Sequence, residues 1–246
     1  MSWAGRSVLA VIPARGGSKG IPRKNLCVVG GSTLVGRALH FARELEWIDR
    51  VVLSTDSEEI AEEGRRHGVE VPTLRPVELA TDTVRSVEVW RHAWLAAEEE
   101  AGHRFDVSLL LQPTSPLRTA EDAERTIASL IDGDHLAAAT VSRTPGHFTP
   151  EKTLTVTRER VLASYLPAER TQSIRQLIPP YFHLNGHCYG AQRRTVVDAG
   201  TLLEDDCVAV EIERPVVNID EPFDLELADW LLARESESIA RSFPPR

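Results

Sequence analysis

Short apolar runs alternate along most of this chain with segments whose apolar residues recur at helical spacing. The runs lie at residues 6–12, 50–54, 69–71, 107–111 and 136–141. Cap signals stand between them at Ser32 or Thr33, at Ser57 and at Thr119. Strands that alternate with helices predict an α/β fold with a mostly parallel sheet and helices on both faces. Ligands of such sheets bind at the carboxyl ends of the strands.

This alternation stops in the second half of the chain. Two β-like runs at 153–157 and 160–165 predict a hairpin, which an arginine- and proline-rich stretch follows. Further strands are expected at 185–191, 207–212 and 216–219, and a last helix after Asp220 with Pro222 in its first turn. We therefore expect a core made of 1–142 and 185–246, and an insertion at 143–184 that acts as a dimer contact or a lid.

The overall charge limits the partners that the chain can bind. The chain has 246 residues, with 28 Lys and Arg against 37 Asp and Glu, which gives a net charge of −9. This balance argues against nucleic acid or a membrane surface as the partner. The three cysteines are widely spaced and indicate neither a zinc site nor a disulfide framework. With no signal pattern and no long apolar span, we expect a cytoplasmic protein.

Positive charge is concentrated in one loop, "IPARGGSKGIPRKNL" at residues 12–26, which contains two of the three lysines. Glycines let a backbone approach an anion closely, and Arg15, Lys19, Arg23 and Lys24 supply charge that suits a polyphosphate. The spacing does not fit a Walker A motif, and the G-x-G-x-x-G fingerprint of dinucleotide-binding dehydrogenases is absent.

This loop and five later blocks resemble the CMP-N-acylneuraminate synthetases, the cytidylyltransferases that activate sialic acid and related acidic sugars. The later blocks are "VVLSTDSEEIAE", "LRPVELATDT", "LLLQPTSPLRTAEDAE", "LNGHCYGA" and "VNIDEPFDLELA". The resemblance implies a Rossmann-like nucleotidyltransferase fold, a homodimer with an interlocking insertion, and dependence on Mg²⁺. The implied reaction transfers CMP from CTP to the anomeric hydroxyl of an acidic 2-keto sugar and releases pyrophosphate.

The same resemblance assigns roles to individual residues. It implies catalytic roles for Arg15, Lys24 and Asp220. It implies nucleotide contacts for Arg15, Gly16, Lys19, Lys24, Asn25, Arg75 and Ser86. It implies contacts with the acidic sugar for Gln112, Lys152, Arg175, Asn185 and Tyr189. Asn185 and Tyr189 are four residues apart and are expected on the same side of one strand.

The chain departs from the family pattern at two positions. Asp220 is the candidate ligand for one or two Mg²⁺ ions, but the family's other aspartate in this motif is Asn218 here. An amide has one charge fewer than a carboxylate, so the metal stoichiometry stays open. His183 stands where many relatives have arginine, which leaves the identity of the sugar open.

Two alternative functions stay open at this point. One is CTP-dependent activation of a different acid, such as Kdo or an acceptor from specialised metabolism. The other is a non-catalytic nucleotide-binding relative, for which Asn218 is the one argument in the sequence.

Overall fold

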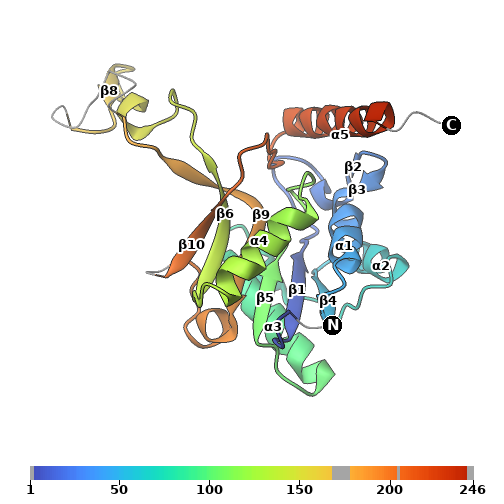
Figure 1. Ribbon diagram of the computed structural model, residues 1–246. Coiled ribbons are helices and arrows are strands. Elements are labelled where there is room, and N and C mark those ends of the chain that lie inside the picture. The colour runs from blue at the N-terminus through green and yellow to red at the C-terminus, as the bar shows by residue number, and fades with distance from the viewer. Residues whose placement is uncertain (1–2, 168–177, 204–205, 243–246) are drawn as a thin grey trace.

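A central sheet of six strands organises the chain in the computed structural model, which describes residues 3–167, 178–203 and 206–242 (Figure 1). Its order is β10-β6-β9-β5-β1-β4. The strands are β1 (Val8–Pro13), β4 (Arg50–Ser54), β5 (Val107–Leu110), β6 (Ala137–Arg143), β9 (Phe182–Gln192) and β10 (Cys207–Glu211). Only β9 runs antiparallel to its neighbours in this sheet, so the predicted mostly parallel sheet is confirmed.

Five α-helices follow from the cap signals and stripes of the sequence. They are α1 (Leu34–Glu44), α2 (Glu58–Arg66), α3 (Ser86–Ala101), α4 (Ala120–Ile131) and α5 (Pro222–Ser242). The Thr33 hydroxyl accepts a hydrogen bond from the Gly36 amide at the start of α1. At the start of α4, Thr119 and Asp122 exchange side-chain and backbone bonds in a capping box. The predicted starts of α1 and α4 are thus confirmed.

The helices cover both faces of the sheet, as expected. One apolar cluster joins α1 and α4 to one face, and a second joins α3 to the other face. Trp90 and Trp94 of α3 are completely buried in the second cluster. A third, smaller cluster joins α5 to the basic loop through Ile21, Leu34 and Ile219. Among the described residues, no helix is long and apolar enough to cross a bilayer.

A wide β-bulge interrupts β9 where it pairs with β6. Ala139 pairs with Tyr189, but Val141 pairs with Leu184, so residues 185–188 lie opposite Thr140 alone. Thr140 fills the gap, because its hydroxyl accepts a hydrogen bond from the Cys188 amide at 2.9 Å. Gly186 has a φ of +77° in this bulge, a conformation that favours glycine.

The predicted hairpin of the insertion is present. Strands β7 (Leu154–Val156) and β8 (Leu162–Ser164) pair antiparallel in a sheet of their own and project from the body of the molecule (Figure 1). Because β6 and β9 still pair at Arg143 and Phe182, the chain leaves the main sheet slightly later, and returns slightly earlier, than expected.

Two predicted strands are absent from the described structure. Residues 69–71 make a single bridge, between Val52 and Glu70, because the chain passes the edge strand β4 only briefly. Residues 216–219 are irregular because they do not run alongside a strand. Their backbone is instead tied to the loop after β5 by a hydrogen bond from the Ile219 amide to the Thr114 carbonyl, at 2.8 Å.

Candidate active site

A cavity of about 380 Å³ lies beyond the carboxyl ends of β1 and β5. The order of the strands reverses at this point of the sheet. The strand of this sheet that follows β1 in sequence, β4, lies on one side of β1, and β5 lies on the other. The predicted residues that line the cavity are Arg15, Lys24, Asn25, Arg75, Ser86, Gln112, Asn218 and Asp220. The fold therefore brings together eight predicted residues from distant parts of the chain.

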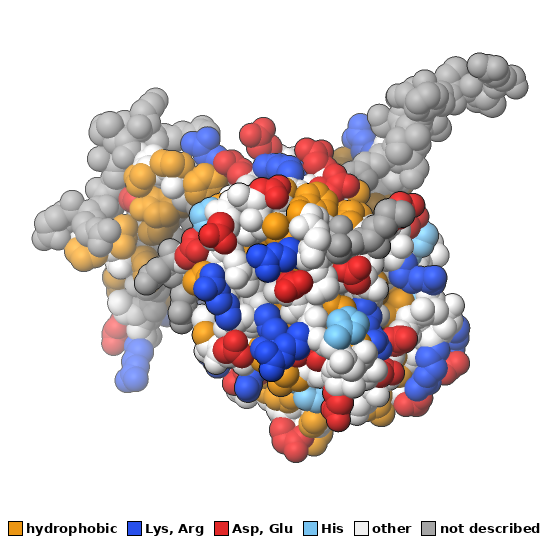
Figure 2. Space-filling view, turned by 60° about the horizontal axis from the view of Figure 1, so that its bottom comes forward, with side chains coloured by type: hydrophobic (Ala, Val, Ile, Leu, Met, Phe, Trp, Pro, Cys, Tyr) orange, Lys and Arg blue, Asp and Glu red, His pale blue; other side chains and the backbone are white. Residues whose placement is uncertain are grey.

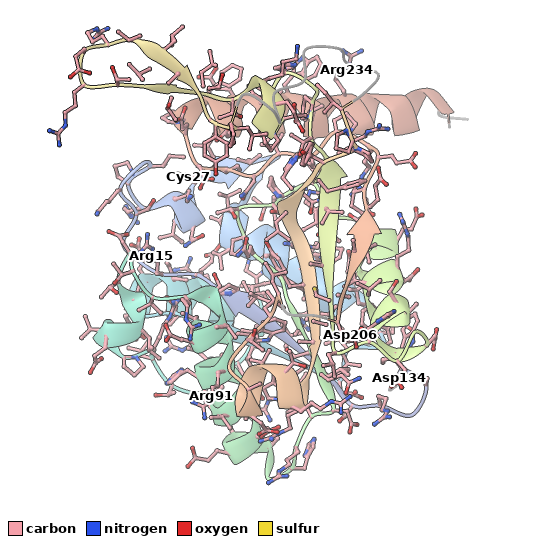
Figure 3. All side chains as sticks on the ribbon, turned by 90° about the vertical axis from the view of Figure 1, so that its left-hand side faces the viewer. Arg15, Cys27, Arg91, Asp134, Asp206 and Arg234 are labelled. Atoms are coloured by element: carbon pink, nitrogen blue, oxygen red, sulfur yellow. The ribbon has the colours of Figure 1, made fainter. Side chains whose placement is uncertain are left out.

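The opposite end of the sheet, at the amino ends of β1 and β5, has no comparable concentration of positive charge among the side chains that Figure 2 shows. Figure 2 views the molecule from that side, and basic and acidic side chains are interspersed there. Figure 3 shows Arg15 and Asp134 on opposite sides of the molecule. The clustered positive charge of the loop after β1 thus belongs to the cavity.

Lys24 joins the basic loop to the segment that contains Asp220. Its Nζ donates to the Ile219 carbonyl at 2.7 Å and forms an ion pair with Asp220 Oδ1 at 3.0 Å. Gly20 packs against the same turn so closely that a Cβ there would lie 2.6 Å from the Asp220 carbonyl oxygen. The cation, the carboxylate and the loop backbone therefore form one unit.

Asp82 forms ion pairs with two further basic residues of the loop. Its carboxylate accepts from Arg15 Nη2 and from Lys19 Nζ, each at 2.7 Å. The hydrogen bonds from Lys19 and Arg15 lower the pKa of Asp82. Lys19 itself does not line the cavity and reaches it only through this carboxylate. Sequence reasoning missed Asp82, because an acidic residue in a turn gives no sign of its distant partners.

Two residues predicted to contact the nucleotide, Gly16 and Asn25, form hydrogen bonds that hold the basic loop in its conformation. The Gly16 amide donates to Asp56 Oδ1 at 2.9 Å, and Gly16 does not line the cavity. Asn25 is buried, and its Nδ2 donates to the Arg15 carbonyl at 2.9 Å. Asn25 still lines the cavity, and within the described part of the chain its Oδ1 has no hydrogen-bond partner.

Arg75 forms part of the cavity wall although it is 6% exposed. Its two terminal nitrogens donate to the Ser54 carbonyl at 2.8 Å and the Leu79 carbonyl at 3.3 Å. Among the described residues its Nε has no partner. Burial lowers the pKa of this guanidinium. Ser86, at the start of α3, lines the same wall, which therefore offers polar groups held in place by backbone.

The predicted sugar contacts divide into two groups. Gln112 follows β5 and lines the cavity. Asn185 does not line it, because it is buried in the bulge, where it donates to the Ser142 hydroxyl and accepts from the His187 amide. Tyr189 packs in the core against α3, and burial raises its pKa. The β9 bulge lies between these two residues, and neither of them lines this cavity, so their contact with the sugar stays a prediction.

The residues predicted from the insertion lie apart from this cavity. Lys152 is exposed beside the hairpin and does not line the cavity. Arg175 lies outside the described residues. His183 is exposed, and its Nδ1 lies 3.1 Å from the Thr144 hydroxyl. In this chain alone, the insertion adds no described side chain to the cavity lining.

A buried layer of charged side chains lies behind the loop that carries Gln112. Arg118 Nη2 donates to the Gln112 carbonyl at 2.7 Å, and its Nε donates to the His187 carbonyl. His187 Nδ1 lies 3.2 Å from Asp122 Oδ2, which also pairs with Arg214. Burial opposes ionisation of Asp122, yet hydrogen bonds from His187 and Arg214 hold its pKa well below its usual range. Arg118 is therefore an anchor for the loop that carries Gln112.

The donor set for a metal ion is sparse. The described residues contain no cluster of three or more His, Cys, Asp or Glu side chains that could hold a metal. Asp220 and Asn218 both line the cavity, and Asp220 keeps an exposed carboxylate beside Lys24. One carboxylate fits a Mg²⁺ ion that takes its remaining ligands from phosphate and water.

Two curated relatives match nearly the whole chain. The chain is 28% identical over 237 residues to the CMP-N,N'-diacetyllegionaminic acid synthase of Legionella pneumophila, covering 94% of this chain and 99% of that protein. It is 26% identical over 239 residues to post-translational flagellin modification protein B of Campylobacter coli, covering 96% and 99%.

Solved structures support the fold. A CMP:2-keto-3-deoxy-manno-octonic acid synthetase complexed with CTP superposes with a TM-score of 0.70 at 18% identity, covering 93% of this chain and 99% of that one. The 4-diphosphocytidyl-2C-methyl-D-erythritol synthase of Anaerococcus prevotii gives a TM-score of 0.62 at 13% identity, covering 94% of this chain and 100% of that one.

A family model shows the family of this chain most directly. The model is described as cytidylyltransferase and matches residues 9–188, well over half of the chain. The chain therefore belongs to the cytidylyltransferase family, whose members are nucleotidyltransferases.

Proposed function

We propose that this chain transfers CMP from CTP to the anomeric hydroxyl of an acidic 2-keto sugar of the nonulosonic acid type and releases pyrophosphate. The observation that carries the proposal is the single cavity in which basic, carboxylate and carboxamide side chains meet at the carboxyl ends of β1 and β5. Since CTP is a cytoplasmic metabolite, we expect the activity in the cytoplasm.

At one end of the cavity, the basic loop is suited to the triphosphate. Arg15 and Lys24 line the cavity, and their charges would stabilise the negative charge that develops on the α-phosphate and the departing pyrophosphate. The Lys24 ammonium is fixed by the Ile219 carbonyl and Asp220, so little reorganisation is needed when the phosphates arrive. Lys19 is bridged to Arg15 by Asp82 and adds charge at the rim.

The wall beside α3 is suited to the base. Asn25 Oδ1 supplies an acceptor without a partner among the described residues, Ser86 adds a hydroxyl, and the buried Arg75 guanidinium contributes charge to the wall. Donors and acceptors held by backbone contacts can read the edge of cytosine. The buried guanidinium and carboxamide would therefore favour CTP over the other nucleotides.

Asp220 is the residue that would hold Mg²⁺. One carboxylate, phosphate oxygens and water match the way in which this ion is usually bound, and we expect one ion rather than two because Asn218 contributes no charge. When bound, the ion would neutralise phosphate charge and so help pyrophosphate to leave. The chain's own contribution is to orient the Asp220 carboxylate through Lys24 and the packing against Gly20.

We also propose that the insertion forms a dimer with a second copy of the chain. Phe148, Leu154, Val156, Leu162 and Tyr165 are each more than half exposed, and Figure 2 shows apolar side chains gathered on the hairpin. A two-stranded hairpin of this kind is marginal alone and needs cover. A dimer would also allow Lys152 and Arg175 of one copy to approach the other copy's cavity. Light scattering tests this, and Leu162→Asp should give monomers.

Pyrophosphate release tests the proposed activity. Wild-type protein would be incubated with Mg²⁺ and CTP against a panel of sialic, legionaminic and pseudaminic acids and Kdo, with UTP and ATP as nucleotide controls. Release with CTP and one nonulosonic acid supports the proposal and names the acceptor. Release with Kdo alone would favour the alternative acid. CTP binding without release for any acid would favour a non-catalytic relative.

A further inference from the structure

Two carboxamides face each other across the bulge of β9. A Cβ placed on Gly186 would lie 3.1 Å from Gln112 Oε1 and 3.7 Å from Asn218 Cγ. Both carboxamides line the cavity, and no side-chain hydrogen bond of either is found within the described part of the chain. Gln112 and Asn218 thus form a polar pair that is open to a ligand, and Gly186, with its positive φ, lies beside both.

This pair lies on a different side of the cavity from the metal candidate. Ile219 is completely buried in the apolar cluster beneath, while its neighbours Asn218 and Asp220 both line the cavity. Asp220 contacts Lys24 and Gly20 of the basic loop, whereas Asn218 lies beside Gly186 and Gln112. The two side chains therefore have different neighbours in the cavity wall, although they are only two residues apart.

Charge explains why an amide suits this position. The acceptor of the proposed reaction is an acid, and like charges placed together cost several kcal/mol. A carboxylate at residue 218 would repel the acid, but a carboxamide can donate to its carboxylate and accept from its hydroxyl or acylamino groups. An uncharged amide oxygen is also a poorer Mg²⁺ ligand than a carboxylate.

We propose that Asn218 binds the acceptor, reading it together with Gln112, and is not a metal ligand in this chain. This inference rests on the proposed function. It assigns Asn218 a role in acceptor specificity, and it leaves the Mg²⁺ and triphosphate contacts to Asp220 and the basic loop.

The test separates acceptor binding from nucleotide and metal binding. Asn218→Asp keeps the size of the side chain and adds one charge, and Gln112→Glu adds the same charge on the other side of Gly186. Ala233→Glu is the matched control, because it adds a negative charge on the exposed surface of α5, well beyond Asp220. For each protein we would measure the acceptor KM at saturating CTP, and by calorimetry the CTP Kd as a function of Mg²⁺.

We expect both cavity variants to raise the acceptor KM about tenfold or more, since like-charge contacts are costly. The CTP Kd and its Mg²⁺ dependence should stay within about twofold of wild type for Asn218→Asp, and all values should do so for Ala233→Glu. If Asn218→Asp instead tightens Mg²⁺-dependent CTP binding and leaves the acceptor KM unchanged, residue 218 is a metal position and the inference is wrong.

Failure of the proposed function gives a different result. If wild-type protein releases no pyrophosphate and calorimetry detects no binding of any acid to its CTP-loaded form, the proposed function and this inference both fail. If wild-type protein is active and Asn218→Asp has a normal acceptor KM, this inference alone fails.

Discussion

The close packing of Gly20 against Asp220 makes a specific prediction about the basic loop. A Cβ on Gly20 would lie 2.6 Å from the Asp220 carbonyl oxygen, whereas real Cβ contacts are essentially never under 3.0 Å. Gly20→Ala must therefore move the backbone of Asp220, or that of the loop, by at least 0.4 Å. The obstacle is backbone, so no side-chain rotation can relieve it.

Both the stability and the activity of Gly20→Ala should fall. Overpacking of this kind costs about 1–3 kcal/mol, and the lower chain entropy of alanine in the unfolded state offsets about 0.4–1 kcal/mol. The net loss is then up to about 2.6 kcal/mol, which for a chain of this size corresponds to a fall in Tm of up to roughly 10 °C. Because a misplacement near 1 Å can cost about 10²-fold, we expect pyrophosphate release to fall roughly 10- to 100-fold.

Gly17 provides a matched control in the same loop. A Cβ on Gly17 meets no atom within 4 Å, and its φ lies outside the region that favours glycine. Gly17→Ala should therefore keep the wild-type Tm. Because Gly17 lines the cavity, only its thermal unfolding serves as the control, and pyrophosphate release is compared between Gly20→Ala and wild type. If the two variants have the same Tm, the steric argument for Gly20 is refuted.

Three further predictions follow from the charged groups. Lys24→Ala should fold normally and lose roughly 10²–10³ in turnover, the usual effect of deleting one preorganised contact to a developing charge, and wild-type turnover would contradict the assignment. Asp82→Asn should tighten pyrophosphate binding a few-fold, as measured by calorimetry, because Arg15 and Lys19 lose a competing anion. Weaker binding would mean that Asp82 instead orients these two cations. Asp122→Asn should lower the free energy of unfolding by about 2–4 kcal/mol at pH 7, because it leaves buried partners uncompensated. The pKa of Asp122 is lower in the folded state than in the unfolded chain, where it is about 3.9. The stabilisation by ionised Asp122 is therefore fully present above that pH and is lost as the pH falls further. In urea unfolding, the free energies of unfolding of wild type and variant should thus begin to converge below about pH 4.

Local patterns predicted most of the fold because each pattern acts over a few residues. β1 is a continuous apolar run that is buried on both faces, so it could be predicted as a strand without knowing which strands pair with it. The hydroxyl of Thr119 caps α4 with an amide three residues away, so that helix start could be read directly. Trp90 and Trp94 are spaced so that they lie on one face of a helix, and this spacing alone predicted that the face is buried.

Features that depend on distant partners could not be predicted in this way. The bulge of β9 depends on Thr140 of another strand, so the sequence around Asn185 and Tyr189 does not reveal it. Asp82 gains its role only when the fold brings Arg15 and Lys19 to it. Arg15, Lys24, Asn25 and Gln112 do line the cavity, because they follow β1 and β5, whose carboxyl ends define where the cavity lies. Gly16 and Lys19 lie on the same loop as Arg15 but do not line the cavity.

The segment from Asn218 to Asp220 connects the two halves of the cavity. Its middle residue is anchored twice, since the Ile219 amide donates to the Thr114 carbonyl after β5 and the Ile219 carbonyl accepts from Lys24 of the basic loop. A shift of either loop must therefore move the residues on both sides of Ile219 together. In the assignment proposed above, Asp220 serves the phosphates and Asn218 the acceptor, and this coupling would then keep donor and acceptor at a fixed separation. Such fixed separation is what an in-line transfer between two bound substrates requires.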